Sequence, residues 1–347
     1  MLRPLRVRVT GSGIASVVLT RLLLAQGVQV FLDPPAAAKA PQRWVAAPIA
    51  SLRLLAEVFG ESDPADFSDA VFVGWRIVDW SERPPSAVRS EALIVDIEEI
   101  ARRLRARLRL TDAESPTEVD WTIVAGGRRG ADFVGGTRTG VFIPVVSPSH
   151  WPRDVTLLRA ADLGWVYVIP VESGSAVALA VAIPGRPHDE VVASAGLIAC
   201  GAPGPEVRVA PGLAHDPSGR LLVAGDAQFA VDPLRGDGVG NAVRGALLAS
   251  ASVLAVADGV SAAKVSAHRR ARAASAFVAH LDAAVEHYES ARNASRWAGE
   301  IAAMRTARGA ATGAAHQPTD LRLERGRLVS WYPHPHLTPQ TFQGGPS

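Results

Sequence analysis

Residues Leu221–Ala251 read LLVAGDAQFAVDPLRGDGVGNAVRGALLASA, and they decide how the rest of the chain is interpreted. The apolar run Leu221–Ala224 predicts a strand, which ends at Gly225 and Asp226. Asp226 therefore lies at the carboxyl end of a strand, where open α/β sheets bind their ligands. A loop rich in proline and glycine follows, and a helix of small residues is predicted to begin near Gly240.

This loop has the composition of a ligand-binding turn. Glycines let the backbone approach a flat or anionic group closely, and three stand here: Gly236, Gly238 and Gly240. The first amides of the following helix favour partial negative charge at the same place. The alternative is a glycine-rich surface loop with no ligand.

A second possible ligand-binding loop, with the spacing of a nucleotide-binding motif, lies near the amino terminus. The predicted strand Leu5–Thr10 runs into the loop Gly11–Ser16, a G-x-G-x-x-S sequence, and the helix Val17–Gln26 follows. The next strand, Val28–Leu32, ends at Asp33, about 20 residues after the loop begins, where a dinucleotide fold places an acid on the adenosine ribose. Ser16 replaces the usual Gly or Ala and is small enough for close packing. The alternative is a glycine turn that binds nothing.

The middle and the end of the chain give weaker patterns. We expect a helix over Ala50–Phe59, strands over Val71–Trp80 and Trp121–Ala125, and an arginine-rich helix over Ile94–Leu110 with a solvated face. Turn residues predict an antiparallel sheet from four further strands: Gly140–Val146, Asp154–Ala160, Gly164–Val171 and Ser175–Ile183. Alanine-rich segments predict helices over Asn241–Asp258 and Ser261–Met304, and Ala307–Ser347 reads as an extended arm.

Composition excludes several classes of function. The 347 residues carry 36 basic and 34 acidic side chains, so nothing indicates a nucleic-acid partner. No apolar stretch reaches the roughly 18 uninterrupted residues of a membrane span. Cys200 is the only cysteine, which favours a reducing, cytoplasmic compartment. We expect no metal site, since His334 and His336 lack a third ligand. His215 precedes the strand that ends at Asp226, so it is a candidate for the site there; the alternative is a surface turn at Asp216-Pro217.

Three blocks of this sequence resemble the FAD-dependent aromatic hydroxylases, a flavoprotein superfamily related to flavin halogenases and geranylgeranyl reductases. The blocks are Gly11–Ser16 with Asp33, the strand and turn at Val119–Arg129, and Gly225-Asp226 with Asp232–Asn241. The three blocks follow one another along the chain in the same order as in that family. The resemblance implies an α/β fold, with a Rossmann-like FAD-binding domain, an inserted antiparallel β-sheet substrate domain and C-terminal helices. Segments 1–70, 91–138 and 205–260 would form the FAD-binding domain, 71–90 and 139–204 the substrate domain, and 261–347 the helices and tail.

The resemblance also implies roles for single residues. The backbone of the first loop would cradle the pyrophosphate, through Gly11, Gly13, Ile14, Ala15 and Ser16. Asp33 would bind the ribose, and Arg43 would reach the flavin phosphates. Asp226, after Gly225, would accept hydrogen bonds from the ribitol, and Pro233 would lie near the face of the flavin ring. The last block would contact the pyrimidine edge of the ring, through Gly236, Gly238, Val239, Gly240 and Asn241.

The activity that the resemblance implies is hydroxylation of an aromatic or electron-rich substrate through a flavin C4a-hydroperoxide, in specialised biosynthesis. The family's middle turn carries Asp-Gly, whereas Gly126-Gly127 stands here, so either NAD(P)H or a separate flavin reductase is the electron source. The segment Gly164–Pro170 resembles the halogenases' Trp-x-Trp-x-Ile-Pro region. The lysine that halogenases need is missing before it, because Lys39 stands in the wrong place. We expect an aromatic substrate that is a small molecule or is bound to a carrier.

Two alternatives stay open: a flavin-dependent reductase or dehydrogenase acting on carbon–carbon bonds, and a flavin-binding accessory protein acting with a partner. Four tryptophans are candidates to line a substrate cavity, although core packing explains most aromatic residues: Trp44, Trp75, Trp80 and Trp165.

Overall fold

A parallel sheet carries both predicted loops at the carboxyl edge of its strands. The computed structural model describes residues 4–34, 43–63, 71–110, 118–127, 131–146, 152–172, 175–216 and 220–330. The strand order is β14-β6-β1-β2, and every neighbouring pair is parallel. The strands are β1 (Arg6–Thr10), β2 (Gln29–Leu32), β6 (Trp121–Val124) and β14 (Leu221–Val223). This confirms the predicted strands to within one residue at each end, because their apolar runs are short and bounded by polar residues or glycine.

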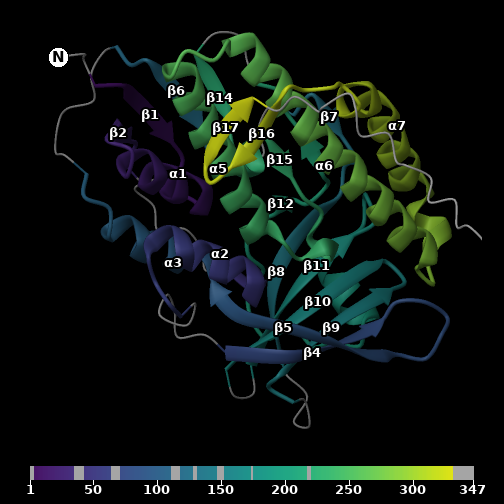
Figure 1. Ribbon diagram of the computed structural model, residues 1–347. Coiled ribbons are helices and arrows are strands. Elements are labelled where there is room, and N and C mark those ends of the chain that lie inside the picture. Colours follow the sequence, from purple (N-terminus) through teal and green to yellow (C-terminus); the bar gives the residue numbers. More distant parts are fainter. Residues whose placement is uncertain are drawn as a thin grey trace, which may run out of the picture.

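Four helices bury the apolar side chains of this sheet in one core (Figure 1). They are α1 (Ile14–Leu24), α2 (Ile49–Phe59), α3 (Ile97–Ala106) and α5 (Gly238–Ala257). Helix α5 packs against both α1 and α2, and its small residues permit this close contact. By length and composition α5 is apolar enough to cross a membrane, but just over half of its apolar window is buried inside the protein. These contacts make it a core helix.

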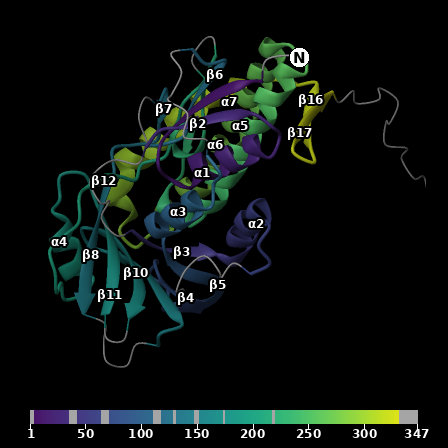
Figure 2. The same cartoon turned by 90° about the vertical axis from the view of Figure 1, so that its left-hand side faces the viewer.

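A larger sheet lies beside the parallel one (Figure 2). Its strand order is β12-β8-β11-β10-β9-β4-β5-β3, and every pair is antiparallel except β4 with β9. The strands are β3 (Trp44–Pro48), β4 (Val71–Asp79), β5 (Ser86–Asp96), β8 (Thr139–Val146), β9 (Val155–Ala161), β10 (Gly164–Glu172), β11 (Ser175–Ala182) and β12 (Val207–Arg208). Short helix α4 (His188–Ser194) covers part of one face. The predicted α/β fold class is confirmed, whereas the domain limits stay a prediction.

The predicted helix Ile94–Leu110 is wrong at its start. Residues Ile94–Asp96 belong to β5, where they pair with β3. Helix α3 begins only at Ile97, because the side chain of Asp96 accepts a hydrogen bond from the amide of Glu98 and so caps the helix. The β-branched residues before Asp96 favour the strand.

The C-terminal region is more regular than the sequence indicated. Helices α6 (Ala262–Ser290) and α7 (Ala298–Ala315) pack against each other, and a hairpin follows, formed by β16 (Leu321–Glu324) and β17 (Arg327–Ser330). The prediction of an extended arm from Ala307 is therefore wrong up to Ser330. Helix α7 continues because Ala307 and Ala311 are buried on its inner face. His334 and His336 lie outside the described residues.

Three small strands complete the fold beside these helices. Their order is β15-β13-β7, and they comprise β7 (Phe133–Val134), β13 (Gly212–Leu213) and β15 (Phe229–Ala230). Strand β15 leads directly into the loop before α5.

The turn after β14 is held against two helices by direct backbone contact. Gly225 has a φ of +60°, and a Cβ atom placed on it would lie 2.5 Å from the Cβ of Ala15 in α1. From the other side, a Cβ on Gly245 in α5 would lie 3.0 Å from the amide nitrogen of Gly225. A side chain at position 225 would force these elements apart.

We expect Gly225→Ala to lower the free energy of unfolding by about 2–4 kcal/mol, because left-handed strain and overpacking add. Urea denaturation measures this change. The control is Gly309→Ala in α7, where nothing lies within 4 Å of the new atom and the helix gains up to about 1 kcal/mol. Equal stability of Gly225→Ala and the wild type would contradict the packing described here.

Candidate functional site

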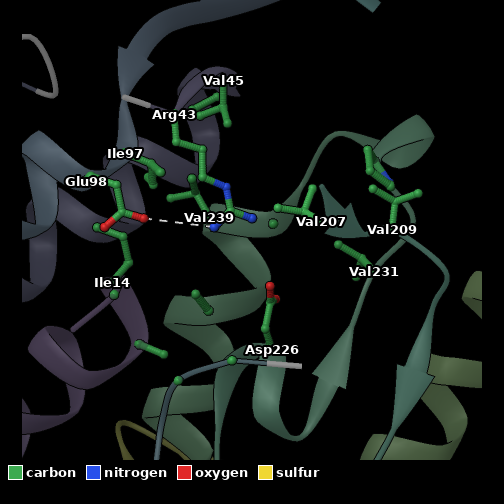
Figure 3. Close-up of a pocket in the computed structure, with 18 of the residues that line it drawn as sticks. Ile14, Arg43, Val45, Ile97, Glu98, Val207, Val209, Asp226, Val231 and Val239 are labelled. Atoms are coloured by element: carbon green, nitrogen blue, oxygen red, sulfur yellow. Dashed lines mark ion pairs between the residues drawn. The ribbon is translucent and has the colours of Figure 1, made fainter. Parts of the chain in front are cut away.

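A cavity of about 660 Å³ opens where the carboxyl edge of the parallel sheet faces the larger sheet. Its walls come from segments far apart in the sequence: the loop after β1, strand β3, the start of α3, the turn after β6, strands β8 and β10–β12, and the chain from β14 to the start of α5. Figure 3 shows Asp226 pointing upward into this space from beneath. Both predicted glycine loops therefore face one cavity.

Most of the predicted site residues line the cavity: Gly11, Gly13, Ile14, Ala15, Arg43, Asp226, Pro233, Gly236, Gly238 and Val239. Five others do not: Ser16, Asp33, Gly225, Gly240 and Asn241.

Four of these five support the walls from behind. Ser16 is fully buried and its hydroxyl donates to the carbonyl of Gly13 at 2.7 Å. Gly225 contacts α1, as described above. Gly240 packs against Ser51, and the side-chain amide of Asn241 donates to the carbonyl of Phe229 at 2.7 Å. Asn241 thereby fixes the strand that precedes the second loop.

Asp33 lies apart from the cavity, at the end of β2. Its amide donates to the carbonyl of Val9 at 3.0 Å, and its own carbonyl accepts from the guanidinium of Arg105. Burial lowers the pKa of Arg105, and the nearby charge of Asp33 opposes this effect. The ribose-binding role of Asp33 stays a prediction.

Helices α1 and α5, which follow the two glycine loops, differ in their N-terminal charge. At α1 the N-cap is Gly13, which has no side chain, and no acidic residue stands in the first turn. Its first amides are therefore open to an anionic group. At α5 the N-cap is Asp237, whose carboxylate accepts from the amide of Gly240 at 3.2 Å and also pairs with Arg244. Anions are favoured at α1, while α5 is already neutralised.

An ion pair lies at one end of the cavity (Figure 3). The guanidinium of Arg43 is 3.9 Å from the carboxylate of Glu98, and both side chains line the space. The backbone of Arg43 is fixed to the start of α3, because its amide donates to Asp96 at 3.2 Å and its carbonyl accepts from the amide of Ile97 at 3.1 Å.

The opposite part of the cavity, toward the larger sheet, is mainly apolar. The residues that line it there are Phe142, Tyr167, Ile169, Leu179, Val207, Val209 and Val231. Of the four candidate tryptophans only Trp44 lines the cavity. Trp75 is on the surface, while Trp80 and Trp165 are buried against α6, where Trp165 donates to the hydroxyl of Tyr288 at 3.1 Å. The hypothesis that all four line a substrate cavity is wrong.

A buried ionic cluster anchors the loop that forms one wall. Arg138 donates to Asp232 at 2.9 Å and also to Glu300 of α7, and all three side chains are buried. Asp232 also accepts from the hydroxyl of Tyr288 at 3.2 Å and from the amide of Leu234 at 3.0 Å. Because Pro233 lines the cavity, the cluster connects this wall to α6 and α7.

Burial and neighbouring charges shift the pKa values of Arg138 and Tyr288 in this cluster. Burial by itself disfavours the charged guanidinium, but the neighbouring carboxylates of Asp232 and Glu300 outweigh it and raise the pKa of Arg138. Burial raises the pKa of Tyr288 well above its ordinary value, so Tyr288 stays a neutral donor.

Sequence reasoning missed several cavity residues. Asp237 has a local signal, an acid just before a glycine-rich helix start, which is typical of an N-cap. Glu98 had none, because the helix was expected to begin earlier. His215 was considered for the site, but it lies outside the cavity and its ring nitrogen is 3.2 Å from Asp132.

Comparison with solved structures places this architecture among known enzymes. The chain superposes on the peptidyl tryptophan dihydroxylase QhpG with a TM-score of 0.68 and 16% identity, covering 94% of this chain and 86% of that one. For the myxobacterial chondrochloren halogenase CndH, an FAD-dependent halogenase, the TM-score is 0.69 at 15% identity, with 90% and 91% covered. For the p-nitrophenol 4-monooxygenase PnpA from Pseudomonas putida it is 0.64 at 16% identity, with 92% and 100% covered.

The chain has the fold of these hydroxylases and FAD-dependent halogenases. This confirms the fold expected from the three motif blocks. No protein-family model and no curated protein sequence matches the chain.

We expect Arg138→Met to lower the free energy of unfolding by about 3–5 kcal/mol, because two buried carboxylates lose their cation. Arg305→Met is the control, since Arg305 pairs with Glu289 on the surface and its loss costs at most about 1 kcal/mol. Urea denaturation compares the two variants. A cost for Arg138→Met no larger than for Arg305→Met would contradict the role of the cluster.

Proposed function

We propose that this protein is an FAD-dependent monooxygenase that hydroxylates an aromatic or otherwise electron-rich substrate. The observation that carries this proposal is that both glycine loops, which lie far apart in the sequence, line one cavity whose wall toward the larger sheet is mainly apolar. A long, bent ligand with an anionic middle and a flat end suits such a cavity.

The residues that line the cavity are suited to binding FAD. Nothing lies within 4 Å of a Cβ atom built at Gly13 or at Gly238, so the space in front of both loops is open. The cavity volume falls within the roughly 300–1,000 Å³ typical of ligand sites. The uncapped start of α1, together with Arg43, would hold the pyrophosphate.

The flat ring system would then lie toward the second loop. Pro233 and the backbone of Gly236–Val239 would contact it, and Asp226 would accept hydrogen bonds from the ribityl chain. The neutralised start of α5 suits an uncharged ring better than a phosphate. The apolar wall beyond would hold the substrate and exclude water. Reduced FAD bound here would supply the activation of molecular oxygen.

We propose hydroxylation and not halogenation because the chain has no lysine at the position that halogenases require. The resemblance to halogenases requires a lysine before the segment Gly164–Pro170. The chain has only Lys39 and Lys264. Lys39 lies outside the described residues, next to the nucleotide unit in sequence, and Lys264 is on the surface near Asp320.

The electron source and the size of the substrate belong to the proposal as well. Gly126 lines the cavity, and a Cβ there would lie 3.0 Å from the Cα of Gly11, so the loop backbone leaves little room for the family's aspartate. This favours a separate flavin reductase over direct reduction by NAD(P)H.

The substrate is a small molecule or one bound to a carrier. The similarity to QhpG, which is named as acting on peptidyl tryptophan, supports a carrier-bound substrate.

The visible spectrum of the purified protein, desalted after incubation with excess FAD, tests the proposal. We expect bound flavin, then oxygen consumption only when an electron donor and an aromatic substrate are both present. Anaerobic reduction of a carbon–carbon double bond would favour the reductase alternative. Flavin that stays inert until a partner protein is added would favour the accessory alternative. Absence of flavin would overturn the proposal.

We expect Gly13→Val to weaken FAD binding by more than tenfold while changing the free energy of unfolding by less than about 1 kcal/mol. The new side chain enters open space and an extended backbone tolerates valine, but the space is then closed to the phosphates. Fluorescence titration with FAD measures the affinity, and Gly299→Val in α7 is the control. Unchanged affinity of Gly13→Val would contradict the assigned phosphate site.

We expect Glu98→Gln to strengthen FAD binding about fivefold, equivalent to about 1 kcal/mol. The carboxylate repels the pyrophosphate and competes with it for Arg43. Glu99→Gln is the matched control, because Glu99 pairs with Arg102 and Arg103, which lower its pKa to about 2, and does not line the cavity. Weaker binding by Glu98→Gln would show that Glu98 supports the cofactor instead.

A further inference from the structure

Asp237 places a carboxylate on the cavity wall, inside the second glycine loop. It stands between Gly236 and Gly238, and all three residues line the cavity. The side chain of Asp237 is 37% exposed, so water screens its charge only in part. Without this acid, the amides at the start of α5 would give the wall partial positive charge.

Three hydrogen bonds hold this carboxylate in place. It accepts from the hydroxyl of Ser51 in α2, from the amide of Gly240 at 3.2 Å and from the guanidinium of Arg244. Ser51 and Gly240 are neutral donors, so they fix the carboxylate without cancelling its charge. Arg244 is a cation, but its side chain is 56% exposed and does not line the cavity. The charged group of this loop that borders the cavity is therefore the carboxylate.

The other charged side chains around the cavity lie on other elements. Arg43 and Glu98 pair with each other. Arg208 lines the cavity from β12 but is exposed, and Asp226 adds a second carboxylate. Arg76 approaches from β4, where a terminal nitrogen lies 3.8 Å from a Cβ built on the first glycine of the loop, but it does not line the cavity.

We propose that Asp237 lowers the reduction potential of the bound FAD and keeps its reduced ring neutral. This inference rests on the proposed function, which places the flat ring of FAD at Gly236–Val239. Two electrons and one proton convert oxidised FAD into an anion whose charge lies on the pyrimidine part of the ring. A second proton, bound at N1 of that part, gives the neutral reduced form.

A fixed carboxylate beside the ring acts differently on these two forms. It repels the anion and has little effect on the neutral form. Charge near N1 is one of the means by which a protein tunes a flavin. Reduction in this site therefore takes up two protons with the two electrons, and it requires a more strongly reducing donor than the same site without the carboxylate.

The reduction equilibrium of the FAD-loaded protein tests the inference without any substrate. Holoprotein and a reference dye are reduced together by dithionite in the absence of oxygen, and absorption spectra give the ratio of reduced to oxidised FAD. Asp237→Asn removes the charge but keeps an oxygen that accepts from Ser51 and Gly240. At a given state of the dye we expect this ratio to rise about tenfold, equivalent to about 30 mV for a two-electron couple.

Three further variants separate charge from structure. Ser51→Ala removes a hydrogen bond but no charge, and it should change the ratio less than about twofold. Arg244→Gln removes the cation that offsets the carboxylate, so the ratio should fall. Asp258→Asn is the matched control and should behave as the wild type, because Asp258 also pairs with an arginine, Arg327, but at the opposite end of α5.

The spectrum of the reduced holoprotein at neutral pH gives the protonation state directly, because the neutral and anionic forms of reduced flavin absorb differently. We expect the neutral form in the wild type and the anion in Asp237→Asn.

The outcomes separate the inference from the proposed function. An unchanged or lower ratio in Asp237→Asn, an equal rise in Ser51→Ala, or an anionic reduced wild type overturns the inference and leaves the FAD assignment in place. If Asp237→Asn does not fold, an unchanged ratio in Arg244→Gln overturns it. Failure of the wild type to bind FAD overturns the proposed function and the inference together.

Discussion

The site depends on backbone contacts that only glycine permits. Gly11 has a φ of +116°, and a Cβ there would lie 2.9 Å from the amide nitrogen of Gly126. At the neighbouring strand, Gly225 fits between α1 and α5 in the same way. Because three adjacent parallel strands end in these contacts, their loops lie close enough to border one cavity. The remaining walls are built onto this edge.

Charge is distributed unevenly along that edge, so the two ends of the cavity differ in their electrostatic character. The open amides of α1 lie at one end, together with Arg43 and its partner Glu98. The start of α5 carries its own carboxylate, and the wall formed by the larger sheet is apolar. For a ligand with an anionic middle and a flat ring at one end, this distribution favours the orientation that places the anionic part at α1 and the ring toward α5.

The sequence predicted the parts of the structure that follow from local patterns. Strand, glycine loop and helix follow in the same order in both motifs, so their meeting at one edge could be deduced, although β15 lies between strand and helix in the second motif. The limits of β5 and α3 could not, since the pairing of β5 with β3 overrides the helical pattern. Asp33 has the expected spacing but lies outside the cavity. Ser51 and Asp237 are 186 positions apart, and only the folded chain brings them together.

The order in which the chain visits its two main sheets has a consequence for folding. Strands β1 and β2 belong to the parallel sheet, β3–β5 to the larger one, β6 to the first again, β8–β12 to the second, and β14 to the first. Neither sheet is a continuous piece of the chain, so no single cut releases one sheet intact. The two layers must assemble cooperatively, and their long-range pairings make that assembly intrinsically slow.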